Sequence, residues 1–344
     1  MQIDAIYRRS MIQTIAGKAI RDLRSGGERE LRNVIELCRG RSMLPEYRRL
    51  WTILEDILRL PGQQYGALLS RAANDVDINC PKTLIANLGL HAYATGSETL
   101  RNNWGAGAAS VYWLEILDET ARSDSLRQTV SSLQQQGTSS FLCRVERETE
   151  LREILRLAGQ NRQCVFILLC RGLSWQRADW EDMTALGNVI PLLAYADVPS
   201  LAGEFKQAGI LFGYYRSYQE IESLEKEEQL LQQCMEAGCF LGVYEGSRQD
   251  TGENQDLFYY AILKKIRQRG AKDILLADLW RDRDSVQKLL LHEQAPAGGA
   301  WSGKSSENRG TEKAEADRTI KGTAARAGLS RPSDQSRKPP RASG

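Results

Sequence analysis

Short apolar runs alternate with helix-length amphipathic stretches from about residue 83 to residue 280. This alternation predicts repeated βα units, whose strands form a parallel sheet with helices packed on its faces. The apolar runs are continuous, as in Val165–Leu169, which is typical of strands covered on both faces. Eight runs are predicted to be strands: Thr83–Leu90, Ser110–Leu117, Ser140–Val145, Cys164–Cys170, Val189–Tyr195, Ile210–Tyr215, Cys239–Tyr244 and Ile274–Leu279.

Eight βα units predict an α/β fold, a complete or partial parallel barrel of the (β/α)8 type. A flat doubly wound sheet is the alternative. Glycines that can end a helix precede four of the predicted strands, at Gly137, Gly187, Gly209 and Gly238. A helix C-terminal cap belongs at such a position, so these glycines support the alternation of helices and strands.

Residues 1–78 are predicted to form a helical segment that precedes the barrel. Apolar residues recur there at spacings of three and four, which predicts helices over 3–23, 30–38, 47–58 and 65–72. A polar turn over Asp75–Pro81 follows, and the barrel is expected to span residues 79–294. The apolar stripes are interpreted as core, with a docking face for a partner protein as the alternative.

Residues 295–344 differ in composition from the rest of the chain, because they are rich in Gly, Ser, Arg, Lys, Glu and Pro. Such a stretch cannot bury enough apolar surface to offset its conformational entropy. A disordered basic tail is therefore predicted, with a polybasic docking tail as the alternative. The formal net charge of the 344 residues is +2, and the tail carries ten basic against five acidic residues. The preceding part is thus slightly acidic, and nucleic acid is not an expected partner.

The seven cysteines form no C-x-x-C pair and no Cys/His spacing of the kind that binds zinc. Several lie inside apolar runs, where Cys behaves as a small buried hydrophobic residue. The sequence contains no charged-then-apolar leader and no apolar run of about eighteen residues. We expect a cytoplasmic protein with reduced thiols, no membrane partner, no metal and no cofactor.

Candidate site residues are sought at the carboxyl ends of the predicted strands, where parallel barrels bind their ligands. Asp197 and Tyr215 lie at such strand ends, but we assign them no catalytic or binding role. His91 and Glu115 are the candidate acids or bases. The candidate ligand-binding residues are Tyr93, Arg144, Glu146, Arg171, Arg216, Tyr244, Glu245 and Asp278.

Glu115 and Arg144 stand out because each interrupts an apolar run, and a charge inside a strand is costly to bury unless it is paired. If both point into the barrel mouth, they form an ion pair or each meets a ligand of opposite charge. An exposed edge or a structural pair is the alternative. For His91, at the end of the first predicted strand, a packing role is the alternative to acid–base chemistry.

Known catalytic motifs do not settle the reaction. The glycines of Gly105-Ala-Gly107 resemble a dinucleotide fingerprint, but they precede a predicted strand, and the fingerprint requires them to follow one. The chain contains no Walker sequence, G-x-S-x-G elbow or H-E-x-x-H pair. The common NTPase, serine-hydrolase and zinc-protease classes therefore lack support.

Three short segments resemble a known group of proteins: Lys82–Gly89, Tyr93–Gly96 and Leu100-Arg101. They are similar to the opening of uncharacterised proteins of anaerobic bacteria, whose barrel resembles that of the radical SAM enzymes. The similarity extends from the N-terminal helices to Ala277–Trp280. Radical SAM enzymes bind a [4Fe–4S] cluster through C-x-x-x-C-x-x-C after the first strand. The corresponding loop, His91–Gly96, contains no Cys, so the resemblance implies a barrel of that class without cluster or SAM cleavage.

Three functions follow from this reading. The first is a non-redox ligand-binding or accessory protein, with a small molecule or a peptide bound at the strand carboxyl ends. The second is a cofactor-independent isomerase or lyase, in which Glu115 or His91 is the base and Arg144 or Arg216 holds a small anionic substrate. The third is a scaffold that binds a partner protein through the N-terminal helices.

Overall fold

A parallel sheet of seven strands forms the centre of the protein, as seen in a computed structural model that describes residues 2–26, 36, 64–105, 111–117, 123–246, 253–269 and 273–291. The strands are β1 (Leu114–Leu117), β2 (Ser140–Val145), β3 (Val165–Cys170), β4 (Val189–Ala194), β5 (Gly213–Ser217), β6 (Leu241–Glu245) and β7 (Leu275–Asp278). Their order in the sheet is their order in the chain, and every neighbouring pair is parallel.

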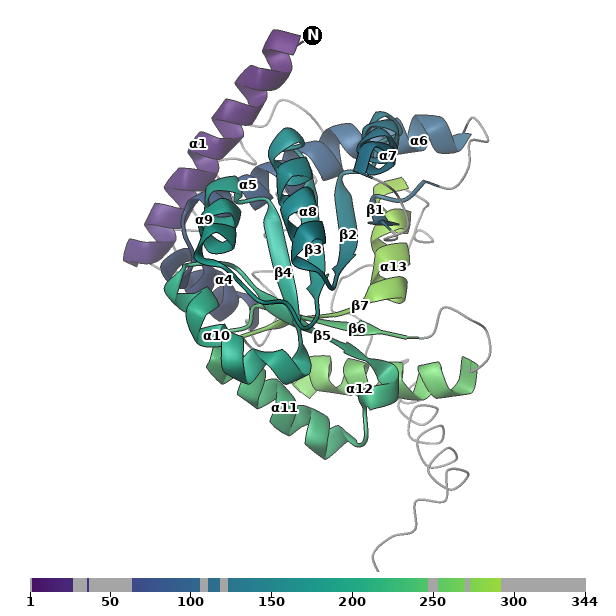
Figure 1. Cartoon of the computed structure of the whole chain (residues 1–344). Helices are drawn as coiled ribbons and strands as arrows, with labels where there is room; N and C mark the ends of the chain where they lie inside the picture. The colour runs from purple at the N-terminus through teal and green to yellow at the C-terminus, as the bar shows by residue number, and fades with distance from the viewer. Residues whose placement is uncertain are drawn as a thin grey trace, which may run out of the picture.

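This strand order belongs to a barrel wall, because a doubly wound sheet reverses its order at a switch point. The sheet curls into a half-barrel (Figure 1). Among the described residues β1 and β7 are edge strands that do not pair with each other, so these seven strands form a partial barrel. The parallel α/β prediction is confirmed and the flat doubly wound alternative is wrong.

Six helices alternate with the strands from β1 to β7 and cover the convex face of the sheet. Gly187 and Gly238 end two of these helices in the left-handed conformation, with φ of 67° and 98°, as predicted for cap positions. The helices are α7 (Ser123–Gln135), α8 (Glu148–Gln160), α9 (Arg177–Leu186), α10 (Val198–Gln207), α11 (Leu224–Ala237) and α12 (Glu253–Arg269).

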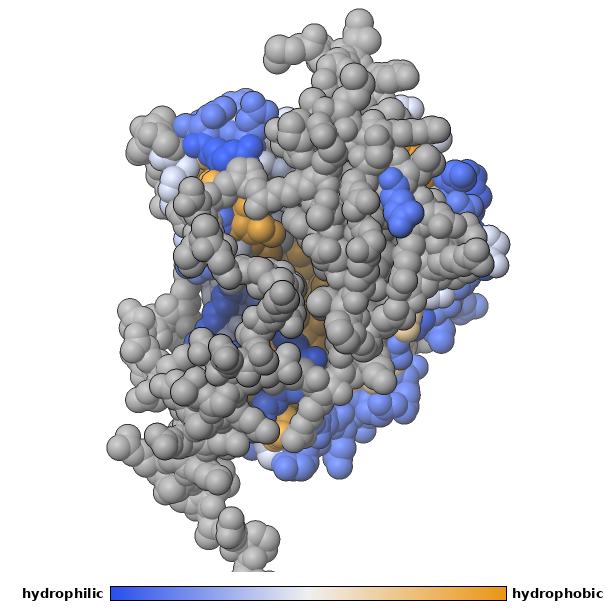
Figure 2. All heavy atoms as spheres, turned by 180° about the vertical axis from the view of Figure 1, so that it is seen from behind, coloured by the Kyte–Doolittle hydropathy of each residue, from blue (hydrophilic) through white to orange (hydrophobic). Residues whose placement is uncertain are grey.

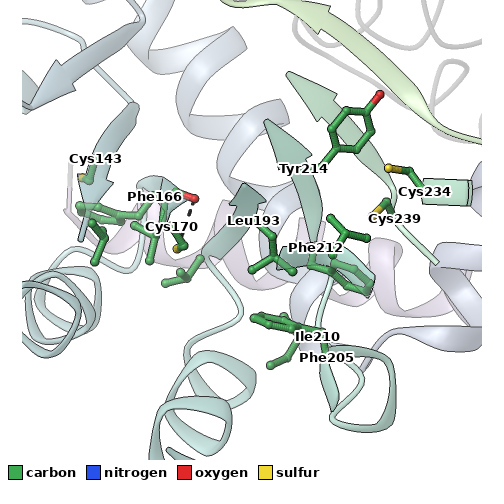
Figure 3. Close-up of a cluster of buried hydrophobic side chains, with 14 of the residues drawn as sticks. Cys143, Phe166, Cys170, Leu193, Phe205, Ile210, Phe212, Tyr214, Cys234 and Cys239 are labelled. Atoms are coloured by element: carbon green, nitrogen blue, oxygen red, sulfur yellow. Dashed lines mark hydrogen bonds between the residues drawn. The ribbon is translucent and has the colours of Figure 1, made fainter. Parts of the chain in front are cut away.

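Successive side chains of each strand point to opposite faces, so the sheet has two hydrophobic layers. Phe166 and Leu193 belong to the convex layer, where they pack with Phe205 of α10 under the helices (Figure 3). Leu142 and Leu192 belong to the concave layer. Both layers are buried, so a strand cannot slip by one residue without exposing its apolar side chains.

Helices also close the concave layer at its amino end. α4 (Gln64–Asp75) and α5 (Asn79–Ile85) carry apolar side chains into that layer, among them Cys80 and Leu84. α1 (Gln2–Gly26) packs against both helices. The predicted helices over 3–23 and 65–72 are thus confirmed. The predicted helices over 30–38 and 47–58 and the predicted tail over 295–344 lie outside the described residues, except for Glu36.

The first predicted strand, Thr83–Leu90, is wrong. This run lies in α5 and in a π-helix, η1 (Ala86–Gly96), which is followed by α6 (Ser97–Gly105). Leu84 is buried whereas the adjacent Ile85 is 40% exposed. A short continuous apolar run fits a buried strand and a half-buried helix equally well, because neither imposes an alternating pattern on it. The predicted strand at 110–117 also shortens to β1.

α13 (Leu279–Leu291) lies between the two edges of the sheet. It continues directly from β7 and is bound to the segment before β1 by the side chain of Gln287, which is 4% exposed. The Trp113 backbone N–H donates to Gln287 Oε1 at 2.9 Å, and Gln287 Nε2 donates to the Val111 carbonyl at 3.1 Å. The Trp113 indole N–H donates to the Arg283 carbonyl at 3.0 Å. α13 therefore links strands that do not pair.

The described helices include none with the length and apolar character needed to span a bilayer.

The link through Gln287 is testable by substitution. In Gln287→Leu the Trp113 N–H and the Val111 carbonyl lose their partner in a buried place, so we expect the free energy of unfolding to fall by about 2 kcal/mol or more. Urea denaturation measures this. Gln229→Leu makes the same chemical change at an exposed position of α11 and should alter stability by less than about 0.5 kcal/mol. Equal effects of the two substitutions would contradict the role of Gln287.

Gly213, the first residue of β5, is a second test of the sheet. A Cβ atom there would lie 2.1 Å from the Leu241 carbonyl oxygen of β6, so Gly213→Ala must push two strands apart. We expect a loss of about 3 kcal/mol in the free energy of unfolding. At Gly203 of α10 a Cβ atom meets nothing within 4 Å, and Gly203→Ala should stabilise by about 0.5–1 kcal/mol. Thermal or urea unfolding of both variants decides between these outcomes.

Candidate functional site

The candidate site lies on the concave face at the carboxyl ends of the strands. Side-chain alternation places Arg144 there because it is two residues beyond Leu142, and it places Glu245 there because it is two residues beyond Val243. Tyr215 of β5 packs against the same concave layer. Seen from the side opposite to that of Figure 1, hydrophobic surface of the described residues lies next to hydrophilic surface (Figure 2).

An ion pair joins Arg144 of β2 to Glu245 of β6. Arg144 Nη2 donates to Glu245 Oε1, although three strands stand between β2 and β6 in the sheet. The curl of the sheet brings the two ends together across the concave face. The side chains are 37% and 21% exposed, so water screens the pair and its net contribution to stability is about 1 kcal/mol or less.

Arg171 and Tyr215 lie on either side of the end of β4. Arg171 directly follows β3, and Tyr215 is opposite Ala194 in the register of β4 and β5. Ala194 has a small side chain, so β4 ends between the two residues with little bulk of its own. Within the described part of the chain, neither the Arg171 guanidinium nor the Tyr215 hydroxyl has a hydrogen-bond partner. Both groups therefore offer donors on the concave face.

The Tyr215 hydroxyl is a neutral donor at physiological pH. Burial raises its pKa to about 12, and nearby Cys170 and Asp197 act in the same direction. The positive charges of Arg171 and Arg144 favour the phenolate and oppose this shift, without reversing it. Both guanidinium charges thus act on the phenol electrostatically. Asp197 lies close by as well, since its Oδ2 accepts a hydrogen bond from the Gly172 N–H at 3.4 Å.

Trp280 supplies an aromatic wall to the concave face. It lies in the first turn of α13 and packs against the concave hydrophobic layer. Its indole N–H donates to the Gly246 carbonyl at 3.3 Å, just after β6. Sequence reasoning did not identify Trp280 as a site residue. The available signal was its position two residues after a strand that ends at Asp278.

Three predicted binding residues lie elsewhere because they point to the convex face. Tyr244 is fully buried, and its hydroxyl bonds the Tyr214 hydroxyl at 2.8 Å and donates to Glu227 Oε1 at 2.6 Å. Arg216 Nη1 lies 3.7 Å from Glu227 Oε2, and its guanidinium stacks over the Tyr195 ring at 5.3 Å. These residues form a polar network between β5, β6 and α11, so they do not face the concave side where the candidate site lies.

Asp278 is the third of these residues and has a structural role. Its Oδ1 accepts from the backbone N–H groups of Trp280 at 3.1 Å and Arg281 at 2.8 Å, at the start of α13. Its Oδ2 accepts from the Tyr218 hydroxyl, and the residue is 2% exposed. A carboxylate that accepts the free N–H groups of a first helical turn is an N-cap, so Asp278 fixes the turn from β7 into α13.

Glu115 also faces away from the concave side. Its register partner in β2 is Phe141, which belongs to the convex layer, and its Oε1 accepts from the Tyr112 N–H at 2.8 Å. Arg144 faces the concave side, so the hypothesis that both point into the mouth is wrong. Successive residues of a strand face opposite sides of the sheet, so an error of one residue in a predicted strand assigns a side chain to the wrong face. Glu146 is exposed just after β2, and its backbone N–H donates to Glu150 at 3.1 Å.

His91 and Tyr93 lie in η1 and not at a strand end. η1 packs at the amino end of the sheet, since Asn87 Nδ2 donates to the Cys164 carbonyl just before β3, at 3.0 Å. Gly96 at the other end of η1 lies against Gly137, which precedes β2. The prediction that His91 and Tyr93 line the carboxyl-end site is wrong. The cause is the misread strand at residues 83–90.

The described cysteines are buried free thiols, as the sequence predicts. Burial raises the pKa of the Cys143 thiol to about 12 and also raises the pKa of Cys170. A thiol with a raised pKa holds little nucleophilic thiolate at neutral pH, so these residues serve packing. Among the described residues, no group of three His, Cys, Asp or Glu side chains is arranged to hold a metal ion.

No model of a known protein family matches this sequence, and a search of curated proteins found none significantly similar to it. The resemblance to cluster-free radical SAM-like barrels therefore stays a prediction. The segment that carries most of it, Lys82–Gly96, is helical in α5 and η1.

The buried carboxyl of Glu227 generates a pH prediction. Burial raises its pKa above the ordinary value of 4.5, against the opposing effects of the Tyr244 hydrogen bond and the Arg216 charge. Between the unfolded and folded pKa values the native state binds more protons, so the Glu227 contribution to stability falls as pH rises from about 4.5. Relative to Glu227→Gln, the wild type should lose stability over this rise.

Urea unfolding of both proteins from pH 4 upward measures that difference. Glu225→Gln, at an exposed position of the same helix, should keep the pH profile of the wild type. Parallel profiles for wild type and Glu227→Gln would show that this carboxyl titrates alike in the folded and unfolded chains.

Proposed function

We propose that the protein is a non-redox ligand-binding protein that takes a small molecule with an anionic group into the carboxyl end of its half-barrel. The strongest support is that two hydrogen-bond donors without a partner among the described residues lie close together at the carboxyl end of the sheet. The Arg171 guanidinium and the Tyr215 hydroxyl have no partner in the described part of the chain, and the charge of Arg144, at the end of β2 on the same face, acts on the same phenol.

These donors suit an anion. A guanidinium presents several N–H groups in a plane that matches carboxylate and phosphate, and hydrogen bonds between ionised groups are among the strongest in proteins. The neutral Tyr215 hydroxyl adds a donor without adding charge. The apolar layer beneath them and the Trp280 ring offer contact to the uncharged part of the same molecule.

Binding is preferred to catalysis because the proposed bases are in the wrong place. A base must come within hydrogen-bond reach of the proton it removes. Glu115 faces the convex side and His91 lies in η1 at the amino end. Glu245, the carboxylate at the mouth, is paired with Arg144. The isomerase or lyase alternative therefore has no observation in its favour, and the scaffold alternative depends on helices that are partly outside the described residues.

Arg171→Gln tests the proposal. In a thermal-shift screen of simple carboxylates, organic phosphates and inorganic phosphate, at least one compound should raise the melting temperature of the wild type. Calorimetric titration of that compound should show affinity reduced about tenfold or more in Arg171→Gln, since a hydrogen bond to a charged group contributes about 1.5–3 kcal/mol.

Tyr215→Phe removes the second donor and should weaken binding of the same compound by a smaller factor. Arg152→Gln, at an exposed position of α8 on the convex side, is the matched control and should bind as the wild type does. A screen without any shift, or an Arg171→Gln protein with wild-type affinity, would overturn the proposal.

A further inference from the structure

We propose that the ligand is a zwitterion, a small molecule with a free amine beside its carboxylate or phosphate, and that its two charges replace the Arg144–Glu245 ion pair when it binds. This inference rests on the proposed binding function and names the ligand class of the same site. A free amino acid is the simplest member of that class.

The position of the ion pair is the first reason. Arg144 and Glu245 reach toward each other from β2 and β6 across the carboxyl end of the concave face, so a molecule that enters there meets the pair. Both side chains remain partly exposed, at 37% and 21%. An ion pair of this exposure is weak and opens at small cost.

The charges at the mouth are the second reason. Arg144 and Arg171 are two cations near Tyr215, while Glu245 and Asp197 are two anions at the same end of the sheet. A simple anion that binds Arg144 takes it away from Glu245 and leaves that carboxylate, 21% exposed, without its counter-charge. Water alone would then solvate the Glu245 carboxylate. A zwitterion supplies an ammonium to Glu245 in the same step, so every charge keeps a partner.

The spacing of the two half-sites is the third reason. Glu245 is the register partner of Ser217, and Ser217 is two residues beyond Tyr215 on the same face of β5. Two residues of a strand span about 7 Å, and side chains shorten the gap by leaning together. The anionic end of a small molecule can therefore lie at Tyr215 and Arg144 while its amine reaches Glu245. Trp280 and the apolar layer remain for its side chain.

A matched set of probes tests the ligand class. The twenty common free amino acids are screened by thermal shift beside their N-acetyl derivatives, which lack the ammonium, and their amides, which lack the carboxylate. Calorimetry then measures the affinity of each compound that binds. We expect at least one free amino acid to bind ten times more tightly than both of its derivatives.

Substitutions at Arg144 and Glu245 test whether the ion pair causes the preference for a free amino acid over its derivatives. In Glu245→Gln the ammonium loses its partner, so the free amino acid should bind at least tenfold less tightly, while the N-acetyl derivative binds as well or better because Arg144 is released. The double variant Arg144→Glu with Glu245→Arg keeps an ion pair and should fold, yet lose the amino acid. Glu204→Gln, at an exposed position of α10, should keep the wild-type preference.

The outcomes separate the two proposals. Equal binding of an amino acid and its N-acetyl derivative, or binding of simple carboxylates and phosphate but of no amino acid, overturns the zwitterion inference and leaves the anion site standing. Unchanged selectivity in Glu245→Gln overturns it as well. Failure of every probe, simple anions included, overturns both.

Discussion

Burial of both faces of the sheet is the constraint on which the rest of this structure depends. Helices cover the convex layer, and the concave layer is filled by side chains from the strands and from α4 and α5. Each strand residue therefore has one permitted direction, and charged residues are tolerated only beyond the apolar part of a strand or with a partner. Arg144 and Glu245 satisfy both conditions on the concave side. Arg216 and Glu227 satisfy the second on the convex side.

The same constraint explains why the two polar groups of the protein differ in character. The convex network of Tyr214, Tyr244 and Glu227 is enclosed and its hydroxyls are mutually hydrogen-bonded, which suits a structural role. The concave group at Arg171 and Tyr215 has donors that the described residues leave unused. Enclosed and satisfied groups hold a fold together, whereas open and unsatisfied donors are available to a ligand.

The sequence predicted the parallel sheet well because apolar runs mark seven strands and capping glycines precede four of them. It failed at Thr83–Leu90, where an apolar run without alternation fits a helix as well as a strand. The site was harder to predict. Arg144, Arg171 and Glu245 were found by their place at strand ends, but Tyr244 and Arg216 satisfied the same criterion. The two sets differ only in the face of the sheet that each side chain occupies. That face depends on the exact residue at which a strand is placed, and predicted strand boundaries are uncertain by more than one residue.

The path of α13 has a consequence for how the protein responds to its surroundings. The helix begins at the Asp278 cap, carries Trp280 to the concave face and ends beyond Gln287, which bonds the segment just before β1 at the other edge of the sheet. A molecule that binds against the indole therefore stabilises the helix that joins the first and last strands. Hydrogen exchange at the amides of residues 111–117 should slow when that molecule is present, so these amides at the edge of the sheet would detect binding at its carboxyl end.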